Sequence, residues 1–184
     1  VLGILTWQQA GLYKDAETLW RGTLAKSPES WMPAENLGII LGERGETDAA
    51  IELFEKVLEL NPNRANAHSN LGICLTRKGR RDEALEHYQE AIRLDPNHLE
   101  AHYNLAMAMA EAGLFDDAIR HYSEALRIWP DHLNSHVNLG VIKARQGKID
   151  DAIRHFSESL RIRPGHPEAA YNLQKARDIQ RKTQ

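Results

Sequence analysis

The sequence predicts an all-α fold, a right-handed superhelix (an α-solenoid) built from helix-turn-helix repeats. The first observation is a proline that recurs every 34 residues, at Pro28, Pro62, Pro96, Pro130 and Pro164. The second is that glycine, alanine and aromatic residues recur at the same interval. The third is that two runs with helical apolar spacing lie between consecutive prolines. A fixed period of this length is typical of stacked helical repeats.

The 34-residue interval divides the chain, a single repeat domain over 1–184, into successive parts. Residues 1–30 are predicted to be a partial N-terminal repeat, and residues 167–184 a C-terminal capping helix. Between them lie four complete repeats, at 31–64, 65–98, 99–132 and 133–166.

Each complete repeat is expected to contain two helices joined by a short turn. Glycine readily adopts the left-handed conformation that ends a helix, so the first helices should end at Gly45, Gly79, Gly113 and Gly147. The second helix should end before the recurring proline, because the residue that precedes a proline is disfavoured in helical conformation. Acidic residues lie just after the glycines, and we expect them to be the N-caps of the second helices: Asp48, Asp82, Asp116 and Asp150.

The two ends of the chain differ in character. The N-terminal segment carries the second half of an earlier repeat but starts with the apolar run Val1–Leu5, with Trp7 and Trp20 nearby. A solenoid needs a polar outer face on its terminal repeat, so we expect this edge to dock on an upstream region or to self-associate. The C-terminal helix is expected to bury one face, made of Ala169, Ala170, Leu173, Ala176 and Ile179.

Composition narrows the function classes. Hydrophobic residues make up 42% of the chain and charged residues 27%, a balance that excludes a disordered protein. The net charge of −3 gives no electrostatic footprint for nucleic acid, and no apolar run reaches the roughly 18 residues of a membrane helix. The lone Cys74 cannot form an internal disulfide. We therefore expect no nucleic-acid partner and no membrane insertion by this chain.

The recurring residues form a recognisable motif. A Leu-Gly pair at 71–72 is followed by Ala84, Tyr88 and Pro96, and the same residue types stand again between Leu139 and Pro164. With this motif the chain resembles the tetratricopeptide-repeat (TPR) family. The resemblance implies a superhelix whose concave groove binds a protein or peptide, acting as an interaction scaffold. The chain departs from the family pattern at Ala106, which replaces the glycine, at Lys143, and at three histidines in place of an aromatic residue, His68, His102 and His136.

A finer resemblance points to a second function. The run Asn66–Gly72 is most similar to the superhelical repeats of O-linked N-acetylglucosamine transferase. The segments Leu5–Gln9 and Tyr13–Trp20 also resemble the junction at which multi-spanning membrane glycosyltransferase-like proteins enter their C-terminal TPRs. This resemblance implies an alternative, the substrate-recruiting domain of a larger membrane-bound glycosyltransferase, with an extracytoplasmic rather than a cytoplasmic location. The sequence alone leaves both alternatives open.

The candidate ligand surface lies on the first helix of each repeat. Around Leu105, the centre of the predicted buried arc, the far side of the helix carries Glu100, Tyr103, Asn104, Met107, Ala110 and Glu111. One row on this side is constant, namely Asn36, Asn70, Asn104, Asn138 and Asn172. A second row is apolar, and Tyr103, Arg77 and Arg145 complete the predicted groove beside Ile39, Ile73, Met107 and Val141.

The asparagine row has two interpretations. An amide side chain offers an acceptor and two donors, so a ladder of asparagines suits an extended peptide backbone. The resemblance to the transferase implies the same use. Alternatively, the asparagines hold neighbouring helices together and the apolar row fills gaps between them.

The nine histidines form three in-phase triplets. The pairs His98–His102 and His132–His136 have a four-residue spacing that can place two imidazoles on one metal ion. No third ligand recurs, and duplication of one ancestral repeat explains the pattern. We therefore predict no metal site and no cofactor.

Other activities find little support in the residues. No phosphate-binding loop, zinc-peptidase motif or nucleophile elbow is present, so no enzymatic activity and no catalytic residue is predicted. Chaperone-binding TPRs clamp a C-terminal carboxylate with basic groove residues, but the positions here are Glu35, Ser69, Tyr103 and Val137. A basic track for RNA is also missing, since charge alternates along Glu43, Arg77, Glu111 and Arg145.

Overall fold

The computed structural model describes residues 16–183, and within this range all regular secondary structure is helical, as predicted. The chain forms two compact units that meet between Pro96 and Asn97. None of the helices described has the length and hydrophobicity needed to cross a bilayer. The predicted apolar edge at Val1–Leu5 and Trp7 lies outside the described residues.

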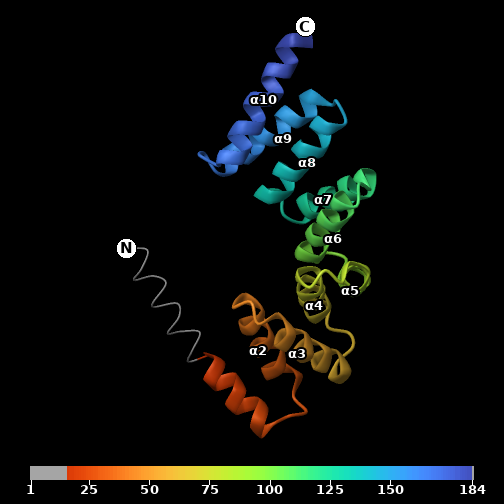
Figure 1. Ribbon diagram of the computed structural model, residues 1–184, viewed down its shortest axis with the longest axis vertical. Coiled ribbons are helices and arrows are strands. Elements are labelled where there is room, and N and C mark those ends of the chain that lie inside the picture. The colour runs from red at the N-terminus through yellow and green to blue at the C-terminus, as the bar shows by residue number, and fades with distance from the viewer. Residues whose placement is uncertain (1–15, 184) are drawn as a thin grey trace, which may run out of the picture. The chain divides into compact units, whose positions relative to one another are not determined.

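In the described part of the N-terminal unit, residues 16–26 are helical and two helix pairs follow them (Figure 1). These are α2 (Trp31–Glu43) with α3 (Thr47–Leu60), and α4 (Ala65–Arg77) with α5 (Arg81–Leu94). The C-terminal unit holds two further pairs and a last helix: α6 (Leu99–Glu111), α7 (Phe115–Ile128), α8 (Leu133–Arg145), α9 (Ile149–Ile162) and α10 (Pro167–Thr183).

The two helices of each pair pack through an aromatic ring on a small residue. The Tyr88 ring lies against Gly72 so closely that a Cβ atom there would stand 2.6 Å from Cε1 of the ring. Phe156 packs on Gly140 in the same way. In the α6–α7 pair the small residue is Ala106, which is fully buried in one cluster with Tyr122. The recurring glycine and aromatic residue therefore form the contact that joins the two helices of a repeat.

The turns between paired helices follow the glycine and proline signals. Gly45, Gly79, Gly113 and Gly147 all have a φ between 74° and 85°, the left-handed conformation that the sequence predicts. The residues before the recurring prolines are extended, as at Asp95 with φ −134° and ψ 96°.

The predicted N-caps are wrong. Asp48 lies in the first turn of α3, where Glu46 is the N-cap and forms no side-chain cap bond. The other second helices repeat this arrangement, with Asp82, Asp116 and Asp150 in the first turn. Acidic side chains are stabilised at this position by the partial positive charge of the helix N-terminus, so the aspartates act through the helix dipole.

Polar contacts join neighbouring repeats at a fixed spacing of 30 residues. In the N-terminal unit, Lys78 Nζ lies 2.8 Å from a carboxylate oxygen of Asp48. In the C-terminal unit, Gln146 donates to Asp116 at 3.4 Å, and Gln180 donates to Asp150 at 2.7 Å. The same two positions of successive repeats are therefore in contact each time.

Helix α10 covers the end of the C-terminal unit with a narrower face than predicted. Ala169, Leu173 and Ala176 are buried, whereas Ala170 is exposed and Ile179 is 38% exposed. Steps of four and three residues keep a stripe on one side of a helix; Ala170, next to Ala169 in the chain, lies off this stripe, and Ile179 lies at its edge. The prediction for these two residues is wrong.

Candidate functional site

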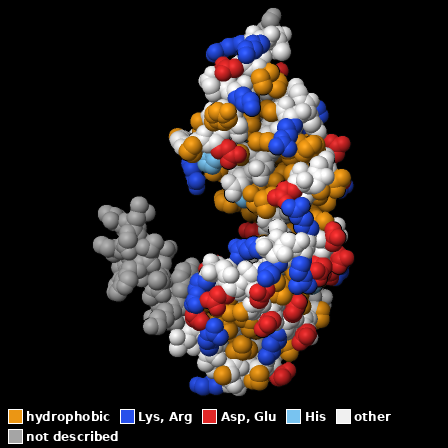
Figure 2. Space-filling view, viewed as in Figure 1, with side chains coloured by type: hydrophobic (Ala, Val, Ile, Leu, Met, Phe, Trp, Pro, Cys, Tyr) orange, Lys and Arg blue, Asp and Glu red, His pale blue; other side chains and the backbone are white. Residues whose placement is uncertain are grey.

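The predicted groove residues lie on the first helices of the pairs and on α10. All five asparagines of the row are partly exposed: Asn36, Asn70, Asn104, Asn138 and Asn172. In the apolar row Ile39 is 37% exposed, and Ile73, Met107 and Val141 are partly exposed. On the face seen in Figure 2, basic side chains are interspersed with acidic ones.

In the N-terminal unit, a pocket lies between α2 and α4 and has a volume of about 190 Å³. The predicted residues among its lining are Ile39, Asn70, Ile73 and Arg77, joined by Glu43. Arg77 Nη1 donates to the carbonyl oxygen of Gly42 at 2.5 Å, so this guanidinium is partly engaged within the protein. We call this site the α2–α4 pocket.

In the C-terminal unit, a larger pocket of about 400 Å³ lies between α6 and α8, the α6–α8 pocket. The Tyr103 and Tyr122 ring centroids are 5.8 Å apart, and Arg145 lies 5.9 Å from the centroid of the Phe115 ring. Burial raises the pKa of both tyrosine hydroxyls, so they stay neutral. Its lining also contains Met107, Asn138, Val141 and Glu111.

A second pocket of the C-terminal unit, about 390 Å³, lies between α8 and α10, the α8–α10 pocket. It shares Val141 and Arg145 with the α6–α8 pocket, so the two adjoin. Its other lining residues include Asn172, Lys175, Ala176 and Ile179. Sequence reasoning missed Lys175, because it stands in the capping helix, which was interpreted only as a cover.

The pockets contain most of the predicted groove residues but not all of them. Asn36 and Asn104 line none of the three pockets. Each is the first asparagine of its unit, and each pocket takes its asparagine from the later of two neighbouring first helices. Phe115 was missed as a groove residue, since its neighbours in the sequence give no ligand signal, whereas Glu43 belongs to the alternating charges expected along the groove.

The asparagine row divides into two kinds of side chain. Asn36 Nδ2 donates to the Met32 carbonyl at 2.9 Å, and Asn138 Nδ2 donates to the Tyr122 hydroxyl at 3.0 Å. Within residues 16–183, no hydrogen bond holds the amide of Asn70, Asn104 or Asn172. Three amides are therefore available to a ligand, and two already serve the protein.

Three positions expected in the groove are buried instead. Ser69 and Val137 are 2% and 3% exposed, and Glu35 is 6% exposed. The Glu35 carboxylate pairs with Arg64, whose guanidinium stacks 3.8 Å from the centroid of the Trp31 ring. Of the four residues at this helix position, Tyr103 alone lines one of the three pockets.

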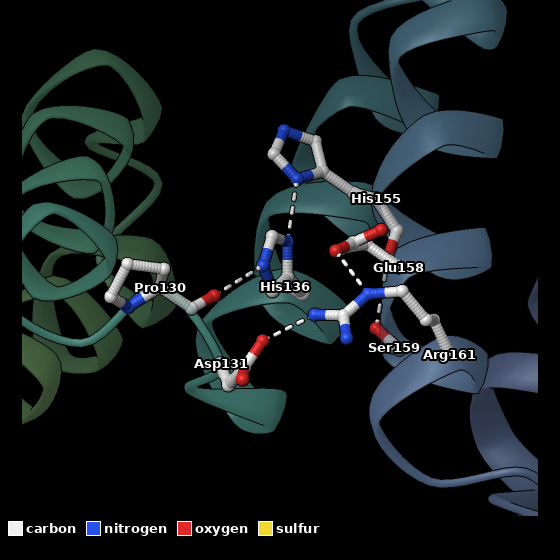
Figure 3. Close-up of polar contacts among 7 residues, drawn as sticks. All are labelled: Pro130, Asp131, His136, His155, Glu158, Ser159 and Arg161. Carbon is white, nitrogen blue, oxygen red and sulfur yellow. Dashed lines mark hydrogen bonds and ion pairs between the residues drawn. The ribbon is translucent and has the colours of Figure 1, made fainter.

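The histidines meet across the two helices of a repeat, not along one helix as the four-residue spacing predicts. In Figure 3, His136 from α8 and His155 from α9 point toward each other, with their Nδ1 atoms 3.1 Å apart. His136 Nε2 also lies 3.0 Å from the Pro130 carbonyl, which makes Nε2 the donor and Nδ1 the acceptor. His68–His87 and His102–His121 repeat this pairing at 2.9 and 3.0 Å.

Other histidines are helix caps. His98 Nδ1 accepts a hydrogen bond from the Ala101 amide, and His166 Nδ1 accepts one from the Ala169 amide, both at 3.2 Å. Across residues 16–183, no three His, Cys, Asp or Glu side chains gather into a group that could hold a metal ion.

The paired histidines favour the neutral form. Burial, followed by the charge of the partner ring, lowers the pKa of His121 to about 4 and that of His155 to about 4. Burial also lowers the pKa of His87. His87, His121 and His155, the members of the pairs on the second helices, are therefore neutral at neutral pH.

The fold and site can be compared with known proteins. Among solved structures, MamA from Desulfovibrio magneticus RS-1 is 22% identical, with a TM-score of 0.73 over 87% of this chain and 90% of that one. YrrB, described as a TPR protein with an unusual peptide-binding site, is 21% identical, with a TM-score of 0.70 over 89% and 84%. A chain of the Cut9–Hcn1 complex is 21% identical with a TM-score of 0.83, covering 92% of this chain but 34% of that one. No curated protein matches the sequence.

The family assignment comes from the sequence itself. A family model described as tetratricopeptide repeat matches residues 32–97 and again residues 97–165. The solved structures show the same stacked helix pairs at low identity, which supports the fold alone. Since the family model covers well over half of the sequence, the chain belongs to the tetratricopeptide-repeat family.

Proposed function

We propose that this chain is a non-catalytic scaffold that binds an extended peptide segment of a protein partner along the first helices of its repeats. The observation that carries the proposal is the lining of the three pockets. Each combines apolar residues with one asparagine of the predicted row, Asn70, Asn138 or Asn172. An apolar wall takes a ligand side chain, while the amide can bond both the N–H and the C=O of a peptide unit.

Two further points support a peptide ligand. The amides of Asn70 and Asn172 carry no hydrogen bond within the described part of the chain, so ligand binding breaks no internal contact there. YrrB, with a similar fold, is described by its peptide-binding site. The glycosyltransferase alternative draws on the same groove, and none of the relatives reported above favours it.

The test begins with selection from a library of random octapeptides displayed between Gly-Ser flanks. Selected peptides are then titrated by calorimetry against the wild type and against Asn70→Ala/Asn104→Ala/Asn172→Ala. Asn138 is left intact because its amide holds Tyr122. Each lost hydrogen bond costs about 0.5–1.5 kcal/mol, so we expect a loss of affinity of at least about tenfold for the triple variant.

The matched control removes two amides outside the pockets, Asn63→Ala/Gln89→Ala, both exposed. It should bind the selected peptides as the wild type does. Circular dichroism must show that both variants fold. A folded triple variant that binds with unchanged affinity would contradict the use of the asparagine row, and failure to select any peptide would contradict the function.

A further inference from the structure

The α8–α10 pocket differs from the other two in its charges. The linings of the α2–α4 and α6–α8 pockets each hold one acidic and one basic residue, Glu43 with Arg77 and Glu111 with Arg145. The α8–α10 pocket holds two basic residues, Arg145 and Lys175, and its lining contains no carboxylate. The electrostatic potential of this pocket is therefore positive, and the rest of its walls are mainly apolar.

Both cations are free to bind a ligand. Within residues 16–183, neither Arg145 nor Lys175 forms an ion pair, although many of the other arginines do. Both side chains are exposed, and the Asn172 amide lies in the same lining. Two unpaired cations and an amide at one apolar pocket form a site for a carboxylate.

The apolar part of the pocket is partly exposed. Val141, Ala144, Ala176 and Ile179 line it, and Ile179 is 38% exposed. The methylene groups of a Glu or Asp side chain, or an adjacent aliphatic residue, can cover this surface while the carboxylate reaches the cations.

The adjoining pocket sets the composition of the rest of the ligand. Because Val141 and Arg145 line both pockets, a chain that occupies one continues into the other. The α6–α8 pocket presents Tyr103, Met107 and Phe115, with Glu111 in its lining. The two rings favour an apolar ligand residue, and the charges of Glu111 and Arg145 in this lining offset each other, so the two pockets take different side chains.

We propose that the C-terminal unit selects internal peptide segments in which an acidic side chain stands next to an apolar one, with the acidic residue in the α8–α10 pocket. This proposal rests on the proposed function and adds the class of partner sequence. We assign the carboxylate to a side chain of an internal segment, and the test below distinguishes this source from a C-terminal carboxylate.

The test uses the same flanked octapeptide library with wild type and with Arg145→Glu/Lys175→Glu. Wild type should select peptides with Asp or Glu beside an aliphatic or aromatic residue, and the reversed variant should select Lys or Arg at that place. A synthetic copy of a selected peptide with blocked ends, and its copy with Glu replaced by Gln, are then titrated against wild type. The Gln copy should bind about fivefold or more weakly, and only the Glu copy should lose affinity when salt rises to about 0.5 M.

The control is Lys148→Glu/Arg177→Glu, two exposed cations outside the pocket lining whose reversal changes the net charge equally. It should select acidic peptides as wild type does. Selected peptides without acidic residues, or an acidic preference that persists in the reversed variant, would overturn the proposal. If the triple asparagine variant binds such peptides more weakly than wild type does, the proposed function stands without the preference for acidic segments. A selection that yields no peptide overturns both the function and this preference. A second library with free C-termini gives the other source of a carboxylate, and acidic selection confined to chain ends would also overturn the proposal.

Discussion

The α4–α5 and α6–α7 pairs are built from the same motif and differ at two small positions. In the first pair Tyr88 packs on Gly72 and its hydroxyl lies 3.1 Å from Thr76 Oγ1, on the same repeat. In the second pair Tyr122 accompanies Ala106, and the residue at the place of Thr76 is Ala110. Tyr122 instead accepts a hydrogen bond from Asn138, on the next first helix.

The difference shows how one buried contact reaches the candidate site. Where the helix offers glycine and a hydroxyl partner, the tyrosine is satisfied inside its own repeat. Where both are replaced by alanine, the hydroxyl needs a partner elsewhere and takes the amide of Asn138. Asn138 then has one donor fewer for a ligand, whereas Asn70 and Asn172 keep both.

The largest expected effect is at the leucines that the two pairs share. Leu71 and Leu105 are 2% and 1% exposed, so Leu71→Ala and Leu105→Ala should each lower the free energy of unfolding by about 2–5 kcal/mol. The exposed Glu111→Ala is the comparison and should cost little. Urea denaturation measures all three. Equal small effects for the leucines and the glutamate would contradict the assignment of the buried helix face.

A smaller effect separates the pairs at Gly72. A Cβ there would lie 2.6 Å from the Tyr88 ring, which the bond to Thr76 holds in place. Gly72→Ala should therefore cost up to about 2 kcal/mol, since overpacking of about 1–3 kcal/mol exceeds a helix-propensity gain of about 1 kcal/mol.

A double-mutant cycle combines Gly72→Ala with a second variant, Thr76→Ala. This second change introduces the residue type that the α6–α7 pair has at the equivalent position, Ala110. In that background the ring can shift, and Gly72→Ala should cost less by about 0.5 kcal/mol or more. Thermal or urea unfolding of the four proteins in the cycle gives the coupling. Strict additivity would show that the hydroxyl contact does not hold the ring.

The tyrosine hydroxyls should differ in function and not in stability. Tyr88→Phe and Tyr122→Phe each remove one hydrogen bond, at a cost of about 0.5–1.5 kcal/mol. Tyr122 lines the α6–α8 pocket and Tyr88 lines none of the three, so only Tyr122→Phe should change the affinity for a selected peptide. Calorimetric titration of both variants checks this, and equal binding by both would mean that Asn138 does not contact the ligand.

The smallest expected effect is one that the two pairs share, a loss of stability in acid. Burial lowers the folded-state pKa of His87, and that of His121 to about 4, while the unfolded value is 6.5. The unfolded chain binds more protons than the folded chain between these pH values. The contribution of the neutral histidines to the free energy of unfolding is therefore complete above about pH 6.5 and is lost as pH falls toward about 4. Each ring is part-exposed, which keeps the loss small.

His121→Gln should flatten the pH profile of the unfolding free energy between pH 6.5 and 4, and His87→Gln should flatten it less. His166→Gln, at a cap outside these pairs, is the control. A profile that is the same in wild type and His121→Gln would show that the paired ring titrates normally.

Most of the fold could be predicted from the sequence because its signals are local and repeated. Gly45 and its equivalents need a left-handed turn, and the prolines need an extended residue before them, whatever the rest of the chain does. The aspartate N-caps were wrong because capping and first-turn positions are two residues apart and attract the same acidic side chains. The face of α10 was too wide, since small apolar residues such as Ala170 are tolerated on an exposed side.

The candidate site could be predicted only in part. A helical wheel places Asn70, Ile73 and Asn138 on one side, and they line pockets. It does not show that Glu35 is buried beside Arg64, or that Asn138 is held by Tyr122, because these contacts come from other helices. The contacts between histidines could not be predicted for the same reason. Spacing within one helix cannot show that His102 faces His121 on the second helix of its repeat.

The contacts at a spacing of 30 residues bear on how such a chain changes its length. Lys78 with Asp48, Gln146 with Asp116, and Gln180 with Asp150 each join one repeat to the next within a unit, at the same two positions. A repeat that carries polar side chains at both positions, added or deleted as a whole block of 34 residues, would meet the same partners at both of its junctions. Duplication or deletion of such a repeat can therefore lengthen or shorten the binding surface without new contacts at the junctions between repeats. A mutation at one of these positions affects only the repeat that it contacts.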